Sequence, residues 1–332
     1  MSVTRIRTAI AFALAIGWAT GALAQVPAPA AWTISEPFAH DDKARTNLSG
    51  AACAPTRPPF KSCLIVNDEK KYAQFFAIDG TRLVPGAVIR LVHKDAESDP
   101  DAEGAAFDAG YFYATGSHGR ARNPDKNSEP SYRVFRFPVG KAGKPAFEVS
   151  EDDIVGVQAS SRLREAIKRG QWIGKFHDQP LDQNGINIEG IAVKNGRAYF
   201  GLRGPSVDGH AFILSVDANA LFSRHRKLNA RVHRLKLGDF AGIRDLAAVR
   251  GGLLVLRGSV NDQAVAPAIY HWNEKTGALT PLGDLQLPQT LPSGAKAETL
   301  LVLRDAKGEP WRVLLMFDGP ENGAPTEYEL AR

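Results

Sequence analysis

Apolar and polar residues alternate along this chain in short runs that are separated by turn residues. The clearest unit of this pattern covers residues 187–237. It begins with the apolar run 188–193, and the pair Asn195-Gly196 then favours a tight hairpin. Three further strands are expected at residues 197–202, 210–216 and 231–237. The last strand alternates polar and apolar positions, as a half-exposed edge strand does, so the unit predicts one four-stranded blade of a β-propeller.

The start of this unit recurs along the chain. It contains the pair Glu189-Gly190 here and the pair Glu103-Gly104 earlier in the sequence. Weaker copies place the equivalent position at Ser49, Asp245 and Glu298. The steps between the five positions are 54, 86, 56 and 53 residues, and repeats of this length are typical of propellers and arrays. The sequence therefore predicts an all-β propeller of five blades.

The remaining blades follow the same template. Their expected strands are 49–54, 62–66, 72–78 and 87–92 in blade one, 103–107, 111–115, 132–138 and 146–149 in blade two, 245–249, 253–257, 268–272 and 278–282 in blade four, and 298–303, 311–317 and 327–330 in blade five. Blade five lacks an outer strand, and residues 31–36 near the other end of the chain supply one. We expect this N-terminal strand to close the ring, because closure removes open sheet edges.

The long step of 86 residues is explained by residues 150–186. Within them, residues 160–169 favour a helix, and Gly170 follows as a stop signal. We expect one short helical insertion between blades two and three. The alternative is a sixth blade formed by this region.

The N-terminal segment has the features of a secretory signal peptide. Arg5 and Arg7 precede the apolar run 9–17, and Ala22-Leu-Ala24 resembles a cleavage site. The apolar run is too short for a membrane-spanning helix, which needs about 20 residues. We expect residues 1–24 to be removed after Ala24, and residues 25–332 to form a single propeller domain in the periplasm or outside the cell.

The charge distribution excludes one class of partner. The formal net charge is +5, and loss of two arginines with residues 1–24 reduces it to +3. Nucleic-acid-binding proteins usually concentrate Lys and Arg in a stripe, whereas here they are scattered among acids. We expect a monomer that binds no nucleic acid and has no membrane span.

The two cysteines are Cys53 and Cys63, ten residues apart. They fall on the first and second strands of blade one and can therefore face each other across a hairpin. A close pair in an exported protein indicates a disulfide rather than a metal site. Such a bond is expected to contribute about 2–3 kcal/mol.

One mouth of the central channel is the place where chemistry is expected. In a four-stranded antiparallel blade, the start of the first strand and the end of the second lie on the same side. The first-strand positions are Ser49, Glu103, Glu189, Asp245 and Glu298. The second-strand positions are Asn67, Asp68, Ser117, His118, Arg203, Arg257 and Asp318. Arg244 competes with Asp245 for its position, since a shift of one residue moves a side chain to the other face of a strand.

These residue types suit the hydrolysis of an anionic substrate. Glu103, Glu189, Asp245 and Glu298 are candidate ligands of a divalent cation such as Ca²⁺, which prefers several oxygen ligands. His118, with Glu103 and Glu189, is the candidate catalytic group. The candidate substrate-binding residues are Arg203, Arg257 and Arg244. The hypothesis is a metal-dependent hydrolase of an ester, lactone or phosphoester.

Two other interpretations remain open. In the first, the propeller binds a small anionic ligand or a protein partner without catalysis. In the second, the Glu and Arg side chains pair with one another and link the blades, which is a common fate of buried charges.

Several phrases in the same order carry a resemblance to a known family. They are Asp101-Ala-Glu103-Gly104, Tyr113-Ala-Thr-Gly-Ser-His118, Asn187-Ile-Glu189-Gly190, Phe200-Gly-Leu-Arg203-Gly204 and Ile243-Arg244-Asp245-Leu246. Together they resemble a bacterial family of exported proteins catalogued as domain of unknown function 3616, from about residue 45 to residue 330. The resemblance implies a propeller and no established activity. The Glu-Gly strand start is more loosely similar to phytase-like esterase and calcium-dependent gluconolactonase propellers, which is an analogy about site location alone.

Overall fold

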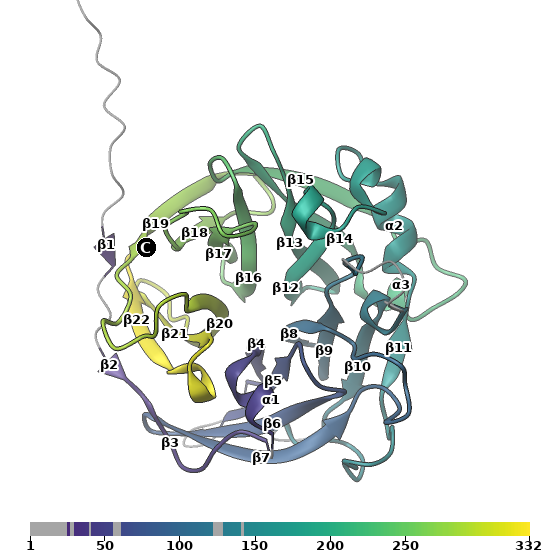
Figure 1. Cartoon of the computed structure of the whole chain (residues 1–332), viewed down its shortest axis with the longest axis vertical. Coiled ribbons are helices and arrows are strands. Elements are labelled where there is room, and N and C mark those ends of the chain that lie inside the picture. Colours follow the sequence, from purple (N-terminus) through teal and green to yellow (C-terminus); the bar gives the residue numbers. More distant parts are fainter. Residues whose placement is uncertain (1–24, 27–29, 40, 56–60, 122–128, 141–142) are drawn as a thin grey trace, which may run out of the picture.

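Five mainly antiparallel sheets stand as blades around a central axis in the computed structural model (Figure 1). The structure describes residues 25–332 apart from 27–29, 40, 56–60, 122–128 and 141–142. The predicted signal peptide, residues 1–24, lies outside the described residues. The predicted all-β propeller of five four-stranded blades is confirmed.

Each blade runs from an inner strand at the axis to an outer strand at the rim. Blade one contains β4 (Leu48–Cys53), β5 (Lys61–Asn67), β6 (Tyr72–Asp79) and β7 (Arg82–Arg90). Blade two contains β8 (Ala102–Asp108), β9 (Tyr111–Gly116), β10 (Val134–Pro138) and β11 (Gln158–Ser160). Blade three contains β12 (Asn187–Lys194), β13 (Arg197–Val207), β14 (His210–Asp217) and β15 (Arg231–Lys236). Blade four contains β16 (Ala241–Val249), β17 (Gly252–Ser259), β18 (Ala268–Trp272) and β19 (Leu279–Leu285). Blade five contains β20 (Lys296–Arg304), β21 (Trp311–Asp318) and β22 (Thr326–Leu330), with an N-terminal strand at its edge.

The outer strand of blade two differs from the prediction. Residues 146–149 form no strand, and the outer position is taken by β11, which pairs with β10. The strand β11 is three residues long and largely exposed, so it lacks the alternation that identifies a strand in sequence. The helical insertion between blades two and three is confirmed, but it begins after residue 160. It contains α2 (Leu163–Arg169), η3 (Gly174–Phe176) and η4 (Leu181–Gln183).

The N-terminal segment crosses the outer edges of three blades (Figure 1). The strand β2 (Ala30–Ala31) pairs antiparallel with β22, so the predicted closure of blade five is confirmed. The expected strand 31–36 is divided, however, because β3 (Thr33–Ile34) pairs parallel with β7 of blade one. Upstream, β1 (Gln25–Val26) pairs parallel with β19 of blade four. Trp32 anchors the crossing, since its indole Nε1 donates a 3.0 Å hydrogen bond to Glu327.

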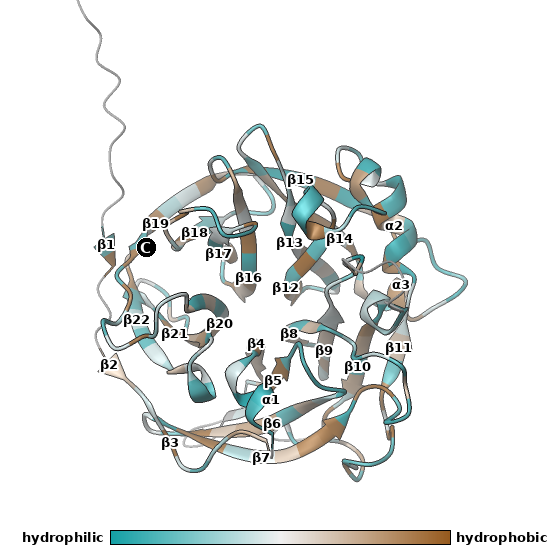
Figure 2. Cartoon of the chain, viewed as in Figure 1, coloured by the Kyte–Doolittle hydropathy of each residue, from teal (hydrophilic) through white to brown (hydrophobic). Residues whose placement is uncertain are grey.

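The hydrophobic core lies between neighbouring blades. Five clusters of buried apolar side chains fill the five interfaces, and Figure 2 shows hydrophobic residues along the strands of every blade. The cluster between blades one and five includes Trp32, Ile65 and Leu314. The ring is therefore packed on both sides of every blade, including the one in which the chain ends meet.

The predicted disulfide between Cys53 and Cys63 is confirmed. The two residues are direct partners in the ladder between β4 and β5, so the bond closes that hairpin. The remaining helices are short: α1 (Asp42–Thr46), α3 (Ala218–Leu221), η1 (Glu129–Tyr132) and η5 (Glu321–Gly323). Among the described residues, no helix has the length and apolar character needed to cross a bilayer.

Candidate functional site

The pairing of each inner strand is irregular near its start. In blade two, Ala102 pairs with Gly116 and Gly104 pairs with Thr115, so Glu103 is an extra residue without a partner in the ladder. Such a β-bulge redirects the side chain of the extra residue. The equivalent residues of blades three, four and five are Glu189, Arg244 and Glu298. Blade one has a similar shift in the stretch that contains Ser49.

Blade four corrects one sequence prediction. Its bulged residue is Arg244, so the expected position of Asp245 is wrong by one residue. Asp245 corresponds instead to Gly190 of blade three. Its buried carboxylate accepts hydrogen bonds of 2.7 Å from the backbone amides of Leu246 and Leu300. Burial raises the pKa of Asp245 well above its usual value, although both hydrogen bonds oppose this shift. Asp245 therefore links blade four to blade five.

The glycines that follow the bulged residues allow the inner strands to meet. A Cβ atom on Gly50 would lie 2.5 Å from Gly104 Cα of the next blade. A Cβ atom on Gly190 would lie 2.7 Å from the backbone nitrogen of Leu246. Real Cβ atoms do not approach so closely. In the repeated Glu-Gly pair, the bulge thus directs the Glu side chain, and the Gly allows the backbones of neighbouring inner strands to approach closely at the axis.

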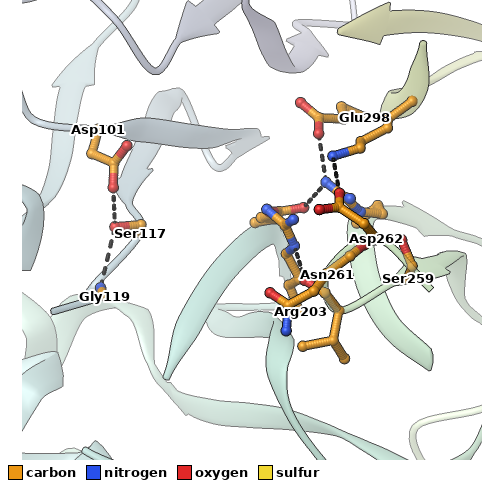
Figure 3. A network of polar contacts seen from close by, with 12 residues as sticks. Asp101, Ser117, Gly119, Arg203, Ser259, Asn261, Asp262 and Glu298 are labelled. Atoms are coloured by element: carbon orange, nitrogen blue, oxygen red, sulfur yellow. Dashed lines mark hydrogen bonds and ion pairs between the residues drawn. The ribbon is translucent and has the colours of Figure 1, made fainter. Parts of the chain in front are cut away.

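Arg244 occupies the centre of a buried ion network with Arg203, Glu189 and Glu298. Its Nη1 lies 3.0 Å from Oε2 of Glu189 and 2.5 Å from Oε1 of Glu298. Arg203, in the second half of β13, places its Nη1 2.7 Å from Oε1 of Glu189. Figure 3 shows Arg203 in this part of the mouth. Burial lowers the pKa of Arg244, but the charges of Glu189 and Glu298 outweigh burial and raise it, so the guanidinium stays charged. The guanidinium of Arg244 therefore links blade four to blade three and to blade five.

A second group of carboxylates, here called the acidic cluster, consists of Asp68, Asp101 and Glu103. One carboxylate oxygen of each lies within 4.8 Å of the others. Asp68 follows the end of β5, Asp101 precedes β8, and Glu103 is the bulged residue of β8. Asp101 also accepts a hydrogen bond from the hydroxyl of Ser117, as Figure 3 shows.

Burial and like charge raise the pKa of Asp68 and Glu103 in the acidic cluster, and that of the nearby Glu298. Burial, and then the charges of Asp101 and Glu298, raise the pKa of Asp68 to about 9. Burial and the charge of Asp101 raise the pKa of Glu103 well above its usual value. Burial likewise raises the pKa of Glu298 to about 8, even though Arg244 lowers it. The cluster and the ion network share one electrostatic environment, because Glu103 is acted on by Glu189 and Glu298 as well.

Blade one contains buried side-chain oxygen atoms that lack a hydrogen-bond partner. Within the described residues, Ser49 Oγ, Asn67 Oδ1 and Asp68 Oδ1 are buried and have no hydrogen-bond partner. Ser49 belongs to the bulge of β4, and Asn67 is the neighbour of Asp68. A hard cation such as Ca²⁺ prefers oxygen ligands, so the three carboxylates of the acidic cluster fit such a cation.

Two of the residues predicted for the site, Arg257 and His118, have other neighbours. Arg257 is engaged inside blade four, where it pairs with Asp284 at 2.9 Å and donates to the hydroxyl of Tyr270 at 3.0 Å. His118 is buried, with its ring centroid 6.5 Å from that of Tyr132. Burial, together with the charge of Arg164, lowers the pKa of His118 to about 3. Among the described residues, neither ring nitrogen of His118 has a hydrogen-bond partner.

Sequence reasoning assigned no ligand role to Asp68 or Asp101. Asp68 was expected at the mouth as a second-strand end, and Asp101 stands two residues before Glu103 in the repeated phrase. Asp318 ends β21, and burial raises its pKa. It faces the same network, because the charges of Arg244 and Glu189 act on it.

Solved structures of similar fold are known. An exo-β-1,3-galactanase from Phanerochaete chrysosporium has a TM-score of 0.50 and 11% identity over 91% of this chain and 63% of its own. This chain thus spans less than two thirds of the galactanase. A GH43_1 enzyme from Xanthomonas citri has a TM-score of 0.48 and 11% identity over 89% of both chains. A family 117 glycoside hydrolase from Zobellia galactanivorans has a TM-score of 0.44 and 11% identity over 90% of this chain and 89% of its own. At 11% identity the likeness to the galactanase shows the fold alone.

Comparison of sequences gives a more specific result. No curated protein matches the chain. The model of a family described as "Protein of unknown function (DUF3616)" matches residues 146–328, which include the inner strands β12, β16 and β20 and their bulges. This match covers more than half of the sequence and confirms the predicted resemblance. The chain therefore belongs to the DUF3616 family of proteins of unknown function.

Proposed function

We propose that the channel mouth is the site of a metal-dependent hydrolase that acts on an anionic ester, lactone or phosphoester. One observation carries the proposal. Three carboxylates with oxygens within 4.8 Å of one another lie beside a buried network that contains two guanidinium groups. The site therefore offers oxygen ligands for a cation and, next to them, positive charge for an anion.

The case for a cation rests on the free-energy cost of holding buried carboxylates close together without a counter-ion. Burial, together with the charge of Asp101, raises the pKa of both Asp68 and Glu103, so the acidic cluster resists full ionisation. A divalent cation removes this repulsion, and the unpartnered oxygens of Ser49 and Asn67 supply further ligands. When bound, the cation would polarise an ester or phosphoryl oxygen and lower the pKa of an attached water.

The case for an anionic substrate rests on Arg203. Its Nη1 binds Glu189 and its Nε donates to the carbonyl of Val260 at 2.6 Å. Among the described residues its Nη2 has no partner, and 16% of the side chain is exposed, against 2% for Arg244. Arg203 is therefore the guanidinium that binds a carboxylate or phosphate of the substrate, and Arg244 holds Glu189 and Glu298 in position.

We assign proton transfer to Glu298. Its pKa of about 8 allows both protonation states near neutral pH, which is what a general acid or base requires. His118 is left out of the proposal, because it is buried beside Tyr132 and its pKa of about 3 makes it a weak base.

A second candidate is a propeller that binds an anionic ligand without catalysis. It is favoured by the contacts of Glu189 and Glu298, both of which bind Arg244 and thereby link blades three, four and five. On this hypothesis the cation and Arg203 hold the ligand, and no group transfers a proton.

Calorimetric titration with Ca²⁺, Mg²⁺ and Mn²⁺ tests the cation site first. We expect one of the cations to bind with a stoichiometry of one and to be lost in Asp68→Asn and Asp101→Asn. The matched control is Asp262→Asn, whose side chain is 94% exposed and, within the described part of the chain, forms a single 3.5 Å pair with Lys296. Absence of cation binding to the unaltered protein at millimolar concentrations would refute the proposal.

A screen of phosphoesters and lactones then separates the two candidates. Hydrolysis that requires the cation and is lost in Glu298→Gln supports the enzyme. Saturable binding of an anionic compound without turnover, weakened by Arg203→Gln, supports the binding propeller instead.

We also propose that the protein acts in the periplasm or outside the cell. The disulfide Cys53–Cys63 supports this location, because disulfides persist in oxidising compartments. The signal-like features of residues 1–24 support it as well.

A further inference from the structure

A basic groove lies at the rim of the propeller, far from the axis, between α2 and the loop that precedes β15 (Figure 1). Its volume is about 850 Å³. Its cationic lining residues are Arg162, Arg169, Arg224, Arg226, Lys227 and Arg231. The acidic residue among the lining residues is Glu165, which pairs with Arg169 at 2.9 Å. The groove therefore carries a large excess of positive charge.

The loop that supplies half of these charges is held in place. The guanidinium of Arg162 donates hydrogen bonds to the backbone carbonyls of Ala220 and Ser223. It also donates one of 2.9 Å to the carbonyl of Arg226. Arg162 thus fixes the backbone that presents Arg224 and Arg226, and a loop that is ordered before binding loses less entropy when a ligand arrives.

An exposed aromatic residue, Trp172, directly follows Gln171, which lines the groove. Val232 lines the groove, and Arg234 is the next residue on the same face of the strand. The guanidinium of Arg234 lies 5.3 Å from the ring centroid of Trp172. Trp172 is 41% exposed, which is unusual for a large aromatic side chain. An exposed apolar ring is therefore next in sequence to a lining residue of the basic groove.

We propose that the basic groove binds a carboxylated oligosaccharide, such as a chain of uronate residues. The fork-shaped guanidinium groups match carboxylates, and the C–H face of a sugar ring packs against an exposed indole. The volume is that of a pocket for a ligand of a few rings. The Arg and Lys side chains line the walls of a groove, so an extended flexible chain can contact more of them than a flat bilayer surface can.

Titration with an oligogalacturonate tests this proposal. The control ligand is the same oligosaccharide with its carboxylates methyl-esterified, which keeps the sugar rings and removes the charge. We expect the acid form to bind, its affinity to fall with added NaCl, and the ester to bind at least about tenfold more weakly.

Variants locate the binding. The exposed loop residues are changed in Arg224→Gln with Arg226→Gln, and we expect affinity to fall at least about tenfold. The control pair is Lys275→Gln with Lys307→Gln, which removes the same charge from exposed turns of blades four and five and should leave affinity unchanged. Trp172→Ala should weaken binding in a protein with an unaltered melting temperature.

Three results would overturn the proposal. The first is equal binding of the acid and the ester, and the second is unchanged affinity in the loop variant. The third is co-sedimentation with anionic phospholipid vesicles through the same arginines in the absence of oligogalacturonate binding, which would assign the groove to a membrane surface. Asp68→Asn should leave groove binding intact, so this test is independent of the function proposed for the channel mouth.

Discussion

Arg244 is the residue around which the channel mouth is organised. It is almost fully buried, and it bonds to one carboxylate of blade three and one of blade five. Its charge offsets that of two buried acids, so its removal leaves both Glu189 and Glu298 uncompensated. A buried pair that loses one partner is strongly destabilised, whereas exposed pairs contribute little.

We expect Arg244→Met to lower the free energy of unfolding by about 3–5 kcal/mol, because Met keeps much of the volume but none of the charge. Urea denaturation measures this change. The control is Arg304→Met, which breaks the half-exposed pair with Glu309 and should cost about 0–1 kcal/mol. A loss below about 1 kcal/mol in Arg244→Met would contradict the role given to this network.

The raised pKa values of the mouth predict how stability depends on pH. The pKa is about 9 for Asp68 and about 8 for Glu298 in the folded protein, both above the values for the unfolded chain. The folded state therefore holds more protons between about pH 4 and pH 9, and stability falls as the pH rises through this range. We expect the melting temperature in the presence of a chelator to fall from pH 5 to pH 9. The fall should be smaller in Asp68→Asn, and added Ca²⁺ at pH 8 should restore stability. A melting temperature that rises over this range would contradict these shifts.

At the scale of single elements, the inner strand is the unit that builds the site. Its bulge directs one side chain into the mouth, and the glycine after the bulge lets the next blade approach. Where blade five has Thr299 at this position, the hydroxyl donates a hydrogen bond to the carbonyl of Ser49. The backbone contacts of the axis thus depend on small or hydrogen-bonding residues.

We expect Gly190→Ala to lower the free energy of unfolding by about 1–3 kcal/mol, because the added Cβ would meet the backbone of Asp245 and Leu246 at 2.7–2.8 Å. The shift of the strand should also disturb Arg244 and weaken cation binding. Gly140→Ala is the control, since the nearest atom to its Cβ is the carbonyl oxygen of Lys144 at 3.8 Å. Thermal and chemical denaturation compare the two variants, and equal stability would show that the axis adapts to the extra carbon.

At the scale of the whole molecule, the N-terminal segment joins three blades into a closed ring. It pairs with β19, β22 and β7 in turn, and it fills the edges of blades four, five and one. The disulfide closes the first hairpin of the same ring. The two proposed binding sites lie on this one scaffold, one at the axis and one at the rim.

We expect the exported protein to begin at Gln25 and to contain no free thiol, since residues 1–24 resemble a signal peptide and both cysteines are bonded. Mass spectrometry of protein from the periplasm or medium, without reduction, measures both properties. Replacement of both cysteines by alanine should lower stability by about 2–3 kcal/mol. Retention of residues 1–24 in the exported protein would show that the predicted cleavage is wrong.

Features that depend on short segments could be read from the sequence. The alternation of the strands and the Asn195-Gly196 hairpin are local patterns, and they repeat at a regular spacing. These patterns were sufficient to predict the number of blades and the pairing of Cys53 with Cys63. The Glu-Gly pairs identified Glu103 and Glu189 as mouth residues for the same reason. The three residues of β11, two of them exposed, were not sufficient, because they are too few to show an alternation of polar and apolar positions.

The tertiary structure alone decided which charges meet. A bulge of one residue determines whether Arg244 or Asp245 enters the mouth, and its register depends on the partner strand rather than on the sequence nearby. The acidic cluster joins Asp68 of blade one to Glu103 of blade two, and the basic groove joins an insertion to a distant loop. Such contacts arise from packing between segments far apart in the chain, and no local pattern records them.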